Sequence, residues 1–293
     1  MQSTTYRTPL EALRDWEREK ATRGDGLTAV LRRENERRAR ERATDRFLDR
    51  LRGDRFDLPQ TGTLLMGITC RDGIVIASDR KIGRGGETVL ADKIFEFSAL
   101  GGPVLFAAEG LTGIRDDFFL LLDGDIRRRR GVDSLYEVKI MVEDIIAELV
   151  RRYTDRVGDS SPIGVLMGGL EGITSGDAVI YYVHAPGYGE KVGFRCTGHG
   201  GPYAYALAKF LCEPSDGSLL TVDEAARRAA FVVGWVADKL DSTVGGTAQV
   251  CILKHKTSKV ETMSEADVSQ LRQLAESHQA DLAHIMGLQL LVP

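Results

Sequence analysis

The chain lacks any hydrophobic run long enough to cross a membrane, and no apolar segment follows a basic start as in a signal peptide. It also lacks an excess of positive charge: its net charge of −4 gives no case for a nucleic-acid partner. The four cysteines show no Cys-x-x-Cys spacing and lie mostly in apolar runs, which indicates reduced thiols. We therefore expect a soluble, cytoplasmic protein that binds neither a membrane nor nucleic acid.

The common signatures of nucleotide, metal and serine chemistry are missing as well. The sequence has no P-loop, no Gly-x-Gly-x-x-Gly after a strand pattern, no His-Glu-x-x-His and no Gly-x-Ser-x-Gly. Its five histidines are scattered without metal-ligand spacing. We expect no metal and no cofactor. A remaining way to make a nucleophile is an N-terminal threonine whose own α-amine, with a pKa of about 7.7–8.0, acts as the base.

What the chain does contain is a hairpin pattern directly after a Gly-Thr junction. Two apolar runs within residues 63–79 flank Asp72-Gly73, a pair that is typical of tight hairpin turns. The first strand would begin at Thr63, directly after Gly62. Thr63 is therefore either an ordinary first residue of a strand or an N-terminus that cleavage of the preceding bond would release.

Residues 1–62 differ from the rest of the chain. They are polar and Arg-rich with helical patterning, and residues 32–42 are charged on every face, so this helix cannot carry a core of its own. Glu and Asp are interleaved with the Arg residues, which argues against RNA binding. The segment is either a detachable or docking segment or a solvated helix without a function.

Beyond Thr63, strand and helix patterns alternate in groups. Besides the hairpin, strands are expected at 89–97, 103–108, 163–167, 178–184, 192–196 and 248–253. Helices are expected at 112–130, 133–157, 201–213 and 221–240, with a final helix opening at 263–265. Thr221 and Glu224 have the spacing of a capping box. Strand groups that alternate with helix pairs do not fit a simple βαβ sheet, so we predict an α+β fold, a four-layer αββα sandwich.

A series of short motifs resembles the β subunit of the archaeal and actinobacterial type of 20S proteasome. The motifs are Gly62-Thr63, Gly67 to Asp79, Lys93-Ile94-Phe95, Gly110-Leu111-Thr112-Gly113, Thr197 to Tyr203, Thr221 to Ala225 and Asp241 to Gly246. Their order and spacing extend over roughly two thirds of the chain. The resemblance implies the N-terminal-nucleophile hydrolase fold and a threonine endopeptidase that degrades unfolded proteins inside a ring-shaped chamber.

The resemblance also implies roles for single residues. Thr63 matches the nucleophile, and Asp79 and Lys93 match the acidic residue and the lysine beside it. A cation next to a hydroxyl lowers the pKa of that hydroxyl and favours a neutral amine. Asp241 matches the carboxylate that supports the N-terminal amine. Thr61 is a rival start, but it lacks a preceding Gly and misses the family spacing to the acidic residue.

Two further functions are implied for the segment around residue 110. Gly110 matches the donor of the oxyanion N–H, and Ala108 is a competing alignment. Phe106 and Thr112 are candidates for the wall of the substrate pocket.

Two positions depart from the family pattern. His199 and Val244 stand where serines would hydrogen-bond around the new amine, and Thr243, one residue off, is expected to point elsewhere. His199 either replaces a serine as donor or acceptor or is a turn residue without a catalytic role.

The resemblance assigns residues 1–62 to a helical prosegment removed by self-cleavage between Gly62 and Thr63, and residues 63–293 to a catalytic domain with a C-terminal helical tail. The implied partners are a homo-oligomeric β ring, proteasome α-type subunits, a regulatory ATPase ring and protein substrates. Two alternatives to the endopeptidase stay open. One is a catalytically silent structural subunit of the same assembly, and the other is an N-terminal-nucleophile amidase that acts on small molecules.

Overall fold

The computed structural model describes residues 62–84, 87–99, 102–128, 132, 134–157, 163–171, 177–212, 218–255 and 259–285. All of them belong to one unit of the chain, Leu58–Pro293. The helices predicted within residues 1–61, the rival Thr61 and the tail beyond residue 285 lie outside the described residues.

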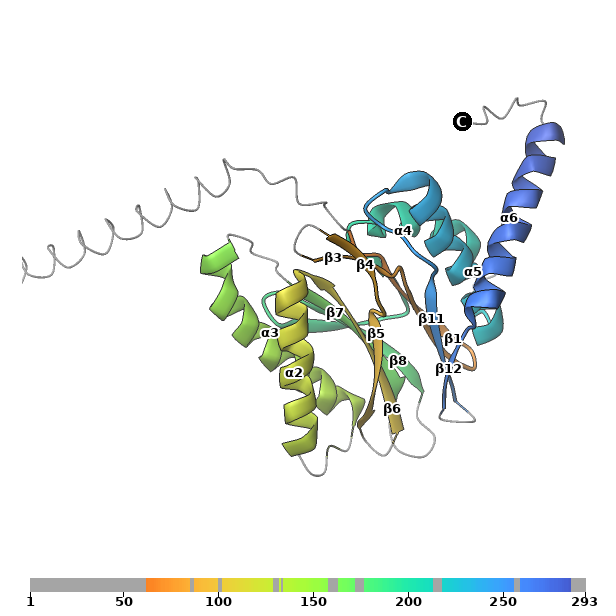
Figure 1. Ribbon diagram of the computed structural model, residues 1–293. Coiled ribbons are helices and arrows are strands. Elements are labelled where there is room, and N and C mark those ends of the chain that lie inside the picture. Colours follow the sequence, from red (N-terminus) through yellow and green to blue (C-terminus); the bar gives the residue numbers. More distant parts are fainter. Residues whose placement is uncertain are drawn as a thin grey trace, which may run out of the picture. The chain divides into compact units, whose positions relative to one another are not determined.

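One five-stranded antiparallel sheet contains the predicted hairpin (Figure 1). Its order is β10-β1-β2-β11-β12, with β1 Leu65–Cys70, β2 Gly73–Ser78, β10 Phe194–Thr197, β11 Gln249–Lys254 and β12 Val260–Thr262. The hairpin strands β1 and β2 pair from Leu65 opposite Ser78 to Cys70 opposite Gly73. Every residue of β2 is buried, so this strand lies at the centre of the domain and fixes the position of the chain that leads into and out of it.

The second five-stranded antiparallel sheet has the order β5-β6-β7-β8-β9. Its strands are β5 Ile94–Ala99, β6 Gly102–Gly110, β7 Ile163–Leu170, β8 Ala178–His184 and β9 Tyr188–Val192. Two short strands, β3 Lys81–Arg84 and β4 Glu87–Leu90, form a separate pair.

Two strand predictions were wrong in the same way, because each joined two strands into one. The predicted strand 89–97 is divided between β4 and β5, and residues 91–93 between them place Lys93 directly before β5. The predicted strand 192–196 is divided at Gly193, where the chain leaves β9 in one sheet and enters β10 in the other. Apolar periodicity shows that a segment is extended but not to which sheet it belongs.

Helices flank both sheets (Figure 1). Helices α2 Thr112–Arg128 and α3 Leu135–Val157 pack on the β5–β9 sheet, and α4 Gly201–Cys212 and α5 Val222–Trp235 pack on the sheet that holds the hairpin. The capping box at Thr221 and Glu224 is confirmed, with both of its hydrogen bonds present. The helix that was predicted to run to residue 240 is α-helical only as far as Trp235, and its last five residues form a turn of π-helix, η1 Val236–Leu240. The final helix, α6 Glu265–Ile285, packs against α5.

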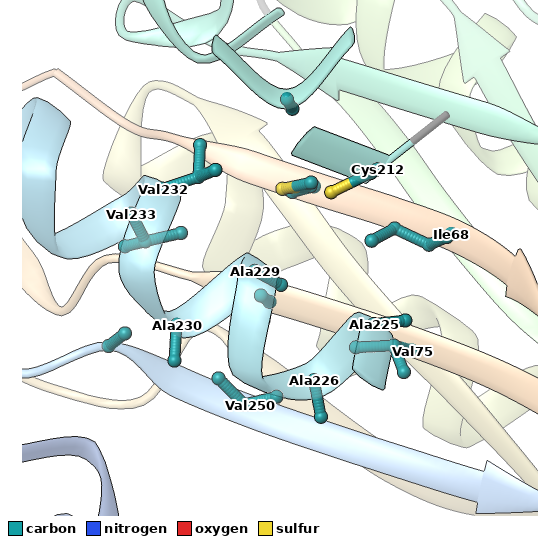
Figure 2. Close-up of a cluster of buried hydrophobic side chains, with 14 of the residues drawn as sticks. Ile68, Val75, Cys212, Ala225, Ala226, Ala229, Ala230, Val232, Val233 and Val250 are labelled. Atoms are coloured by element: carbon teal, nitrogen blue, oxygen red, sulfur yellow. The ribbon is translucent and has the colours of Figure 1, made fainter. Parts of the chain in front are cut away.

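Three clusters of buried apolar side chains correspond to the three interfaces between these layers. One lies between the hairpin sheet and α4–α5, and Figure 2 shows its small side chains from α5 packed on Ile68, Val75 and Val250. A second lies between the β5–β9 sheet and α2–α3, and a third holds side chains from both sheets. The α+β prediction with two sheets between helices is therefore confirmed. None of the four cysteines forms a disulfide, and no described helix is long and apolar enough to span a membrane.

Candidate active site

A fully buried ion pair lies at the mouth of the hairpin. Lys93 Nζ donates a hydrogen bond to Asp79 Oδ1 at 2.6 Å, and the two side chains are 1 % and 0 % exposed. Asp79 directly follows β2, and Lys93 directly precedes β5, so the pair joins the two sheets. Charges buried to this extent are tolerated only when they are paired and hydrogen-bonded, and both conditions are met here.

Backbone amides complete the hydrogen bonding of Asp79. Its Oδ1 also accepts from Leu64 N at 2.9 Å, and its Oδ2 accepts from Lys81 N and from Gly245 N, each at 3.1 Å. Four donors therefore hold this carboxylate. Because one of them is the amide that follows Thr63, the same carboxylate that orients Lys93 also fixes the chain next to the candidate nucleophile.

Gln249 holds Lys93 from the other side, and sequence reasoning missed it. Its Oε1 accepts from Lys93 N at 2.8 Å and from Ile94 N at 3.0 Å, while its Nε2 donates to Ile94 O at 3.0 Å. Gln249 is buried and opens β11, opposite Ser78 in β2. A polar residue at the start of an otherwise apolar strand was the available signal.

Thr63 lies within reach of this lysine. Lys93 Nζ is 3.4 Å from Thr63 Oγ1 and 3.5 Å from the carbonyl oxygen of Gly62. The hydroxyl and the carbonyl of the bond that would be cut therefore share one ammonium group. A cation in this position stabilises negative charge on either oxygen.

Burial sets the protonation behaviour of Lys93. Burial lowers the pKa of its ammonium, Asp79 opposes this effect, and the nearby Arg115 adds to the lowering; the net pKa lies below the usual range of lysine. A lysine with a lowered pKa gives up its proton more readily, so Lys93 is suited to exchange a proton with a neighbouring hydroxyl.

A second group of polar side chains comes from the turns after β10 and after η1. Asp241 Oδ2 lies 2.9 Å from His199 Nδ1, and Asp241 Oδ1 accepts from Thr243 N at 2.9 Å and from Thr243 Oγ1 at 2.6 Å. Burial raises the pKa of Asp241, but the hydrogen bonds from Thr243 and His199 outweigh it and leave the pKa below its usual value. Asp241 thus stays ionised at neutral pH.

Thr243 corrects one expectation. We expected it to point elsewhere, yet its Oγ1 bonds Asp241 and lies 3.1 Å from His199 Nδ1. Val244, at the expected serine position, is instead buried in the cluster under α4 and α5. The hydroxyl is supplied one residue earlier, because the turn after Asp241 directs residue 243 toward the site and residue 244 into the core.

Gly62 fits tightly against this second group. Its N–H donates to Thr243 O at 2.9 Å, and a β-carbon at Gly62 would clash with Thr243 Oγ1 and lie 2.9 Å from His199 Cβ. The residue before Thr63 is therefore held in a space that suits glycine alone.

The backbone of Thr63 rests on the turn that follows β10. Gly200 N donates to Thr63 O at 3.3 Å, and Gly198, with φ +85, packs directly on that carbonyl.

The two candidate donors of the oxyanion N–H differ in exposure. Gly110 is exposed at the end of β6, whereas the competing Ala108 is fully buried inside that strand.

The two candidate pocket residues are placed differently. Phe106 is fully buried in the cluster under α2 and α3, edge-on to Phe97, so it is not part of a pocket wall. Thr112 is half-buried at the start of α2, where its Oγ1 donates to Gly83 O at 3.3 Å. Within the described ranges, no group of three or more His, Cys, Asp or Glu side chains is arranged to hold a metal ion.

Comparisons with known proteins point in one direction. The family model described as Proteasome subunit matches residues 60–253. The proteasome subunit beta of Thermoplasma acidophilum is 23 % identical over 223 residues, which is 73 % of this chain and 96 % of that protein. The proteasome subunit beta of Methanocella paludicola is 25 % identical over 203 residues, 67 % of this chain and 90 % of that protein.

Solved structures agree on the fold. Anbu, an ancestral β-subunit, from Yersinia bercovieri aligns with a TM-score of 0.64 at 16 % identity, over 78 % of this chain and 99 % of that chain. The helical assembly of the Anbu complex from Pseudomonas aeruginosa aligns with a TM-score of 0.64 at 18 % identity, over 78 % of this chain and 98 % of that chain.

Proposed function

This chain belongs to the proteasome subunit family, and on that premise we propose that it is a threonine endopeptidase activated by cleavage of the Gly62–Thr63 bond. One observation carries the proposal: Lys93 Nζ, in a buried ion pair with Asp79, lies 3.4 Å from Thr63 Oγ1. A hydroxyl beside a fixed ammonium group is the arrangement that an activated threonine nucleophile requires.

Peptide cleavage would use the released α-amine of Thr63 as the base. The amine takes the hydroxyl proton while Oγ1 bonds to the substrate carbonyl carbon, and the negative charge on the carbonyl oxygen is held by a backbone N–H. The C–N bond then breaks as the leaving nitrogen takes that proton, and water hydrolyses the ester. Gly110 is the preferred donor of the N–H, since it is exposed while Ala108 is enclosed in its strand.

Maturation would use the same hydroxyl on the bond before it. Oγ1 of Thr63 attacks the Gly62 carbonyl carbon and gives up its proton, the C–N bond breaks as the ester forms, and the leaving nitrogen of Thr63 takes up that proton. Water then hydrolyses the ester, which restores the hydroxyl and releases residues 1–62 with a new carboxylate. The ammonium of Lys93, 3.5 Å from that carbonyl oxygen, supports this step by stabilising the developing charge. Residues 1–62 are then a prosegment, and residues 63–293 are the catalytic domain.

The group around Asp241 would serve the new amine. Thr243 and His199 flank the space that Gly62 occupies before cleavage, and Asp241 is bonded to both of them. The family pattern has a serine at the position of Val244, and the hydroxyl of Thr243 would take over the role of that serine. In this proposal His199 places an imidazole where the family pattern has a serine.

Assembly is proposed by analogy. The Anbu complex of Pseudomonas aeruginosa forms a helical assembly, and we infer that this chain also forms a homo-oligomer. A closed β ring, α-type subunits and an ATPase ring stay predictions of the sequence resemblance.

The test is the N-terminus of the purified, assembled protein. We expect intact mass and N-terminal sequencing to show a chain that begins Thr63-Leu64-Leu65, and we expect hydrolysis of a fluorogenic peptide. Thr63→Ala should abolish both processing and hydrolysis without loss of assembly, and Thr61→Ala is the matched control that should change neither. Processing that survives Thr63→Ala would overturn the assignment of the nucleophile.

A second candidate function is a silent structural subunit. The departures at His199 and Val244 favour it, because neither residue is the serine that the family pattern carries. An assembled protein with an uncut chain and no peptide hydrolysis would select this candidate. A monomer that cleaves small amides would instead select the amidase.

A further inference from the structure

Glu109 lies directly before Gly110, the preferred oxyanion donor, and binds two hydroxyl groups of the domain core. It is half-buried near the end of β6, and its Oε1 accepts hydrogen bonds from Tyr182 OH and, at 2.6 Å, from Thr197 Oγ1. The two hydroxyls are also 3.2 Å apart, so the three groups form a closed cluster. Both hydroxyl residues are buried.

The cluster connects the two sheets. Glu109 and Tyr182 lie on β6 and β8 in one sheet, whereas Thr197 is the last residue of β10 in the other. The hydrogen bond from Thr197 to Glu109 is thus a direct tie across the domain. It joins the next-to-last residue of β6 to the last residue of β10, and each of these residues is followed directly by a backbone segment of the candidate site.

Those two segments are Gly110 and the turn at Gly198–Gly200. Gly110 immediately follows Glu109, and Gly198, which immediately follows Thr197, packs on the carbonyl of Thr63. The other oxygen of Glu109, Oε2, would lie 3.1 Å from a β-carbon at Gly198. The carboxylate of Glu109 therefore contacts the Gly198–Gly200 turn, on which Thr63 rests, while the backbone of Glu109 continues directly into Gly110.

The surroundings are shaped to hold a carboxylate. Gly164 on β7 pairs with Glu109, and a β-carbon at Gly164 would lie 2.8 Å from Glu109 Oε1. Burial raises the pKa of Tyr182, and Glu109 raises it further, so the phenol stays protonated and remains a donor. The guanidinium of Arg195 lies over the Tyr182 ring, 4.4 Å from its centroid, and closes the outer side.

We propose that Glu109 is a positioning residue, which ties Gly110 to the Gly198–Gly200 turn and so fixes the oxyanion N–H relative to Thr63. The proposal rests on the proposed function and deepens it. Hydrogen bonds to an ionised acceptor are about twice as strong as those between neutral groups, which suits a carboxylate to this task. Small displacements of a donor in an oxyanion site reduce the rate strongly.

The experiment compares three variants of the full chain in its assembled state. Glu109→Leu removes the acceptor, Thr197→Val removes one donor, and Glu109→Gln keeps an oxygen that can accept both hydroxyls. Thr69→Val is the matched control, because Thr69 is a half-buried threonine on β1 whose Oγ1 makes one hydrogen bond, to Val192 O. For each variant, kcat and KM are measured per titrated active site, together with inhibition by a peptide aldehyde.

An aldehyde reports on the oxyanion directly, since its adduct with threonine carries an oxygen where the tetrahedral intermediate would. We expect Glu109→Leu to lower kcat and weaken aldehyde inhibition about 10–100-fold, with little change in KM. Thr197→Val should act in the same direction, Glu109→Gln should restore most of both values, and Thr69→Val should change neither. Unchanged kcat and aldehyde inhibition in both Glu109→Leu and Thr197→Val would overturn the proposal.

Hydrogen exchange separates this proposal from the proposed function. Thr197→Val should speed amide exchange at the end of β6, on the other sheet, and Glu109→Leu should speed it in the 198–200 turn. These shifts require no catalysis, so they test the tie even in a protein that proves inactive. Exchange that changes only next to each substitution would show that the two segments are not coupled and would overturn the tie.

Discussion

The two halves of the candidate site differ most in their exposure to water. On the lysine half, Asp79 and Lys93 are 0 % and 1 % exposed, and Gln249 is buried behind them. On the amine half, the side chain of His199 is 60 % exposed although its partner Asp241 is 4 % exposed. Only the amine half can therefore exchange protons freely with solvent.

This difference explains why the chain tolerates a departure from the family pattern at His199. A buried charge that loses its partner costs several kcal/mol, so neither Asp79 nor Lys93 can be exchanged alone. An exposed imidazole can replace a hydroxyl without such a cost, because water solvates what the protein does not. His199 lies on this exposed side, whereas Val244 is buried in the core and the neighbouring Thr243 supplies a hydroxyl to Asp241 instead.

The largest effect is expected from breaking the lysine half. Lys93→Met should reduce peptide hydrolysis by about 10²–10³-fold because the hydroxyl loses its cation. It should also lower the free energy of unfolding by about 3–5 kcal/mol, because Asp79 is left charged and buried. Steady-state kinetics and urea unfolding measure the two effects.

Lys139→Met is the matched control for that variant. Lys139 is a buried lysine on α3 that pairs with Glu143 at 2.8 Å, away from the hairpin. It should lower stability and leave hydrolysis per folded site unchanged. If Lys93→Met behaved like Lys139→Met, the pair with Asp79 would be structural only.

The next effect concerns the boundary between the halves. Gly62→Ala should slow self-cleavage by about 10²-fold, since a β-carbon would clash with Thr243 and displace the bond that is cut. Adding Thr243→Ala should recover part of the rate by removing the clashing oxygen. Gly102→Ala, where a β-carbon meets nothing within 4 Å, should cleave at the normal rate. Normal cleavage of Gly62→Ala would contradict the packing seen here.

Much of this comparison could be predicted from the sequence, but not all of it. The residues of the lysine half were named from the family resemblance, because Thr63, Asp79 and Lys93 match its motifs in order and spacing. The hairpin that ends at Asp79 was a local signal, through its two apolar runs and its Asp-Gly turn. Gln249 was not, since it contacts Lys93 from a strand more than a hundred positions away in the chain and only the paired sheets bring them together.

The amine half was less predictable because turn geometry decides it. The direction of residues 243 and 244 depends on the backbone after Asp241, where the N–H and hydroxyl of Thr243 both bond the preceding carboxylate. Such a local side-chain bond competes with regular structure and leaves no periodic trace in the sequence. The position of Phe106 was hard to predict for a different reason: β6 is apolar on both faces, so the sequence did not indicate which of the two faces Phe106 occupies.

A smaller effect would sharpen the comparison at His199. The groups that face its imidazole are Asp241 and Thr243. If the imidazole serves the Thr63 amine, His199→Ala should lower kcat/KM for peptide hydrolysis by about tenfold or less, and His199→Ser should restore part of it by returning a hydroxyl to this position. Equal kcat/KM in both variants and the unsubstituted chain would assign His199 to the turn alone.

The smallest effect is on stability and belongs to Asp241. Its pKa is below the usual value in the folded chain, so the unfolded chain binds more protons in the interval between that lowered pKa and about 3.9. The resulting stabilisation is complete above the unfolded pKa and is lost as pH falls through the folded one.

Asp241→Asn should therefore lower the free energy of unfolding by about 1–2 kcal/mol at neutral pH, and the difference from the unsubstituted chain should shrink in acid. Asp123→Asn, on the exposed pair with Arg127, should cost less than Asp241→Asn at neutral pH. Urea unfolding at equal protein concentration measures both variants, and a difference for Asp241→Asn that stayed constant with pH would show that its carboxylate gains nothing from Thr243 and His199.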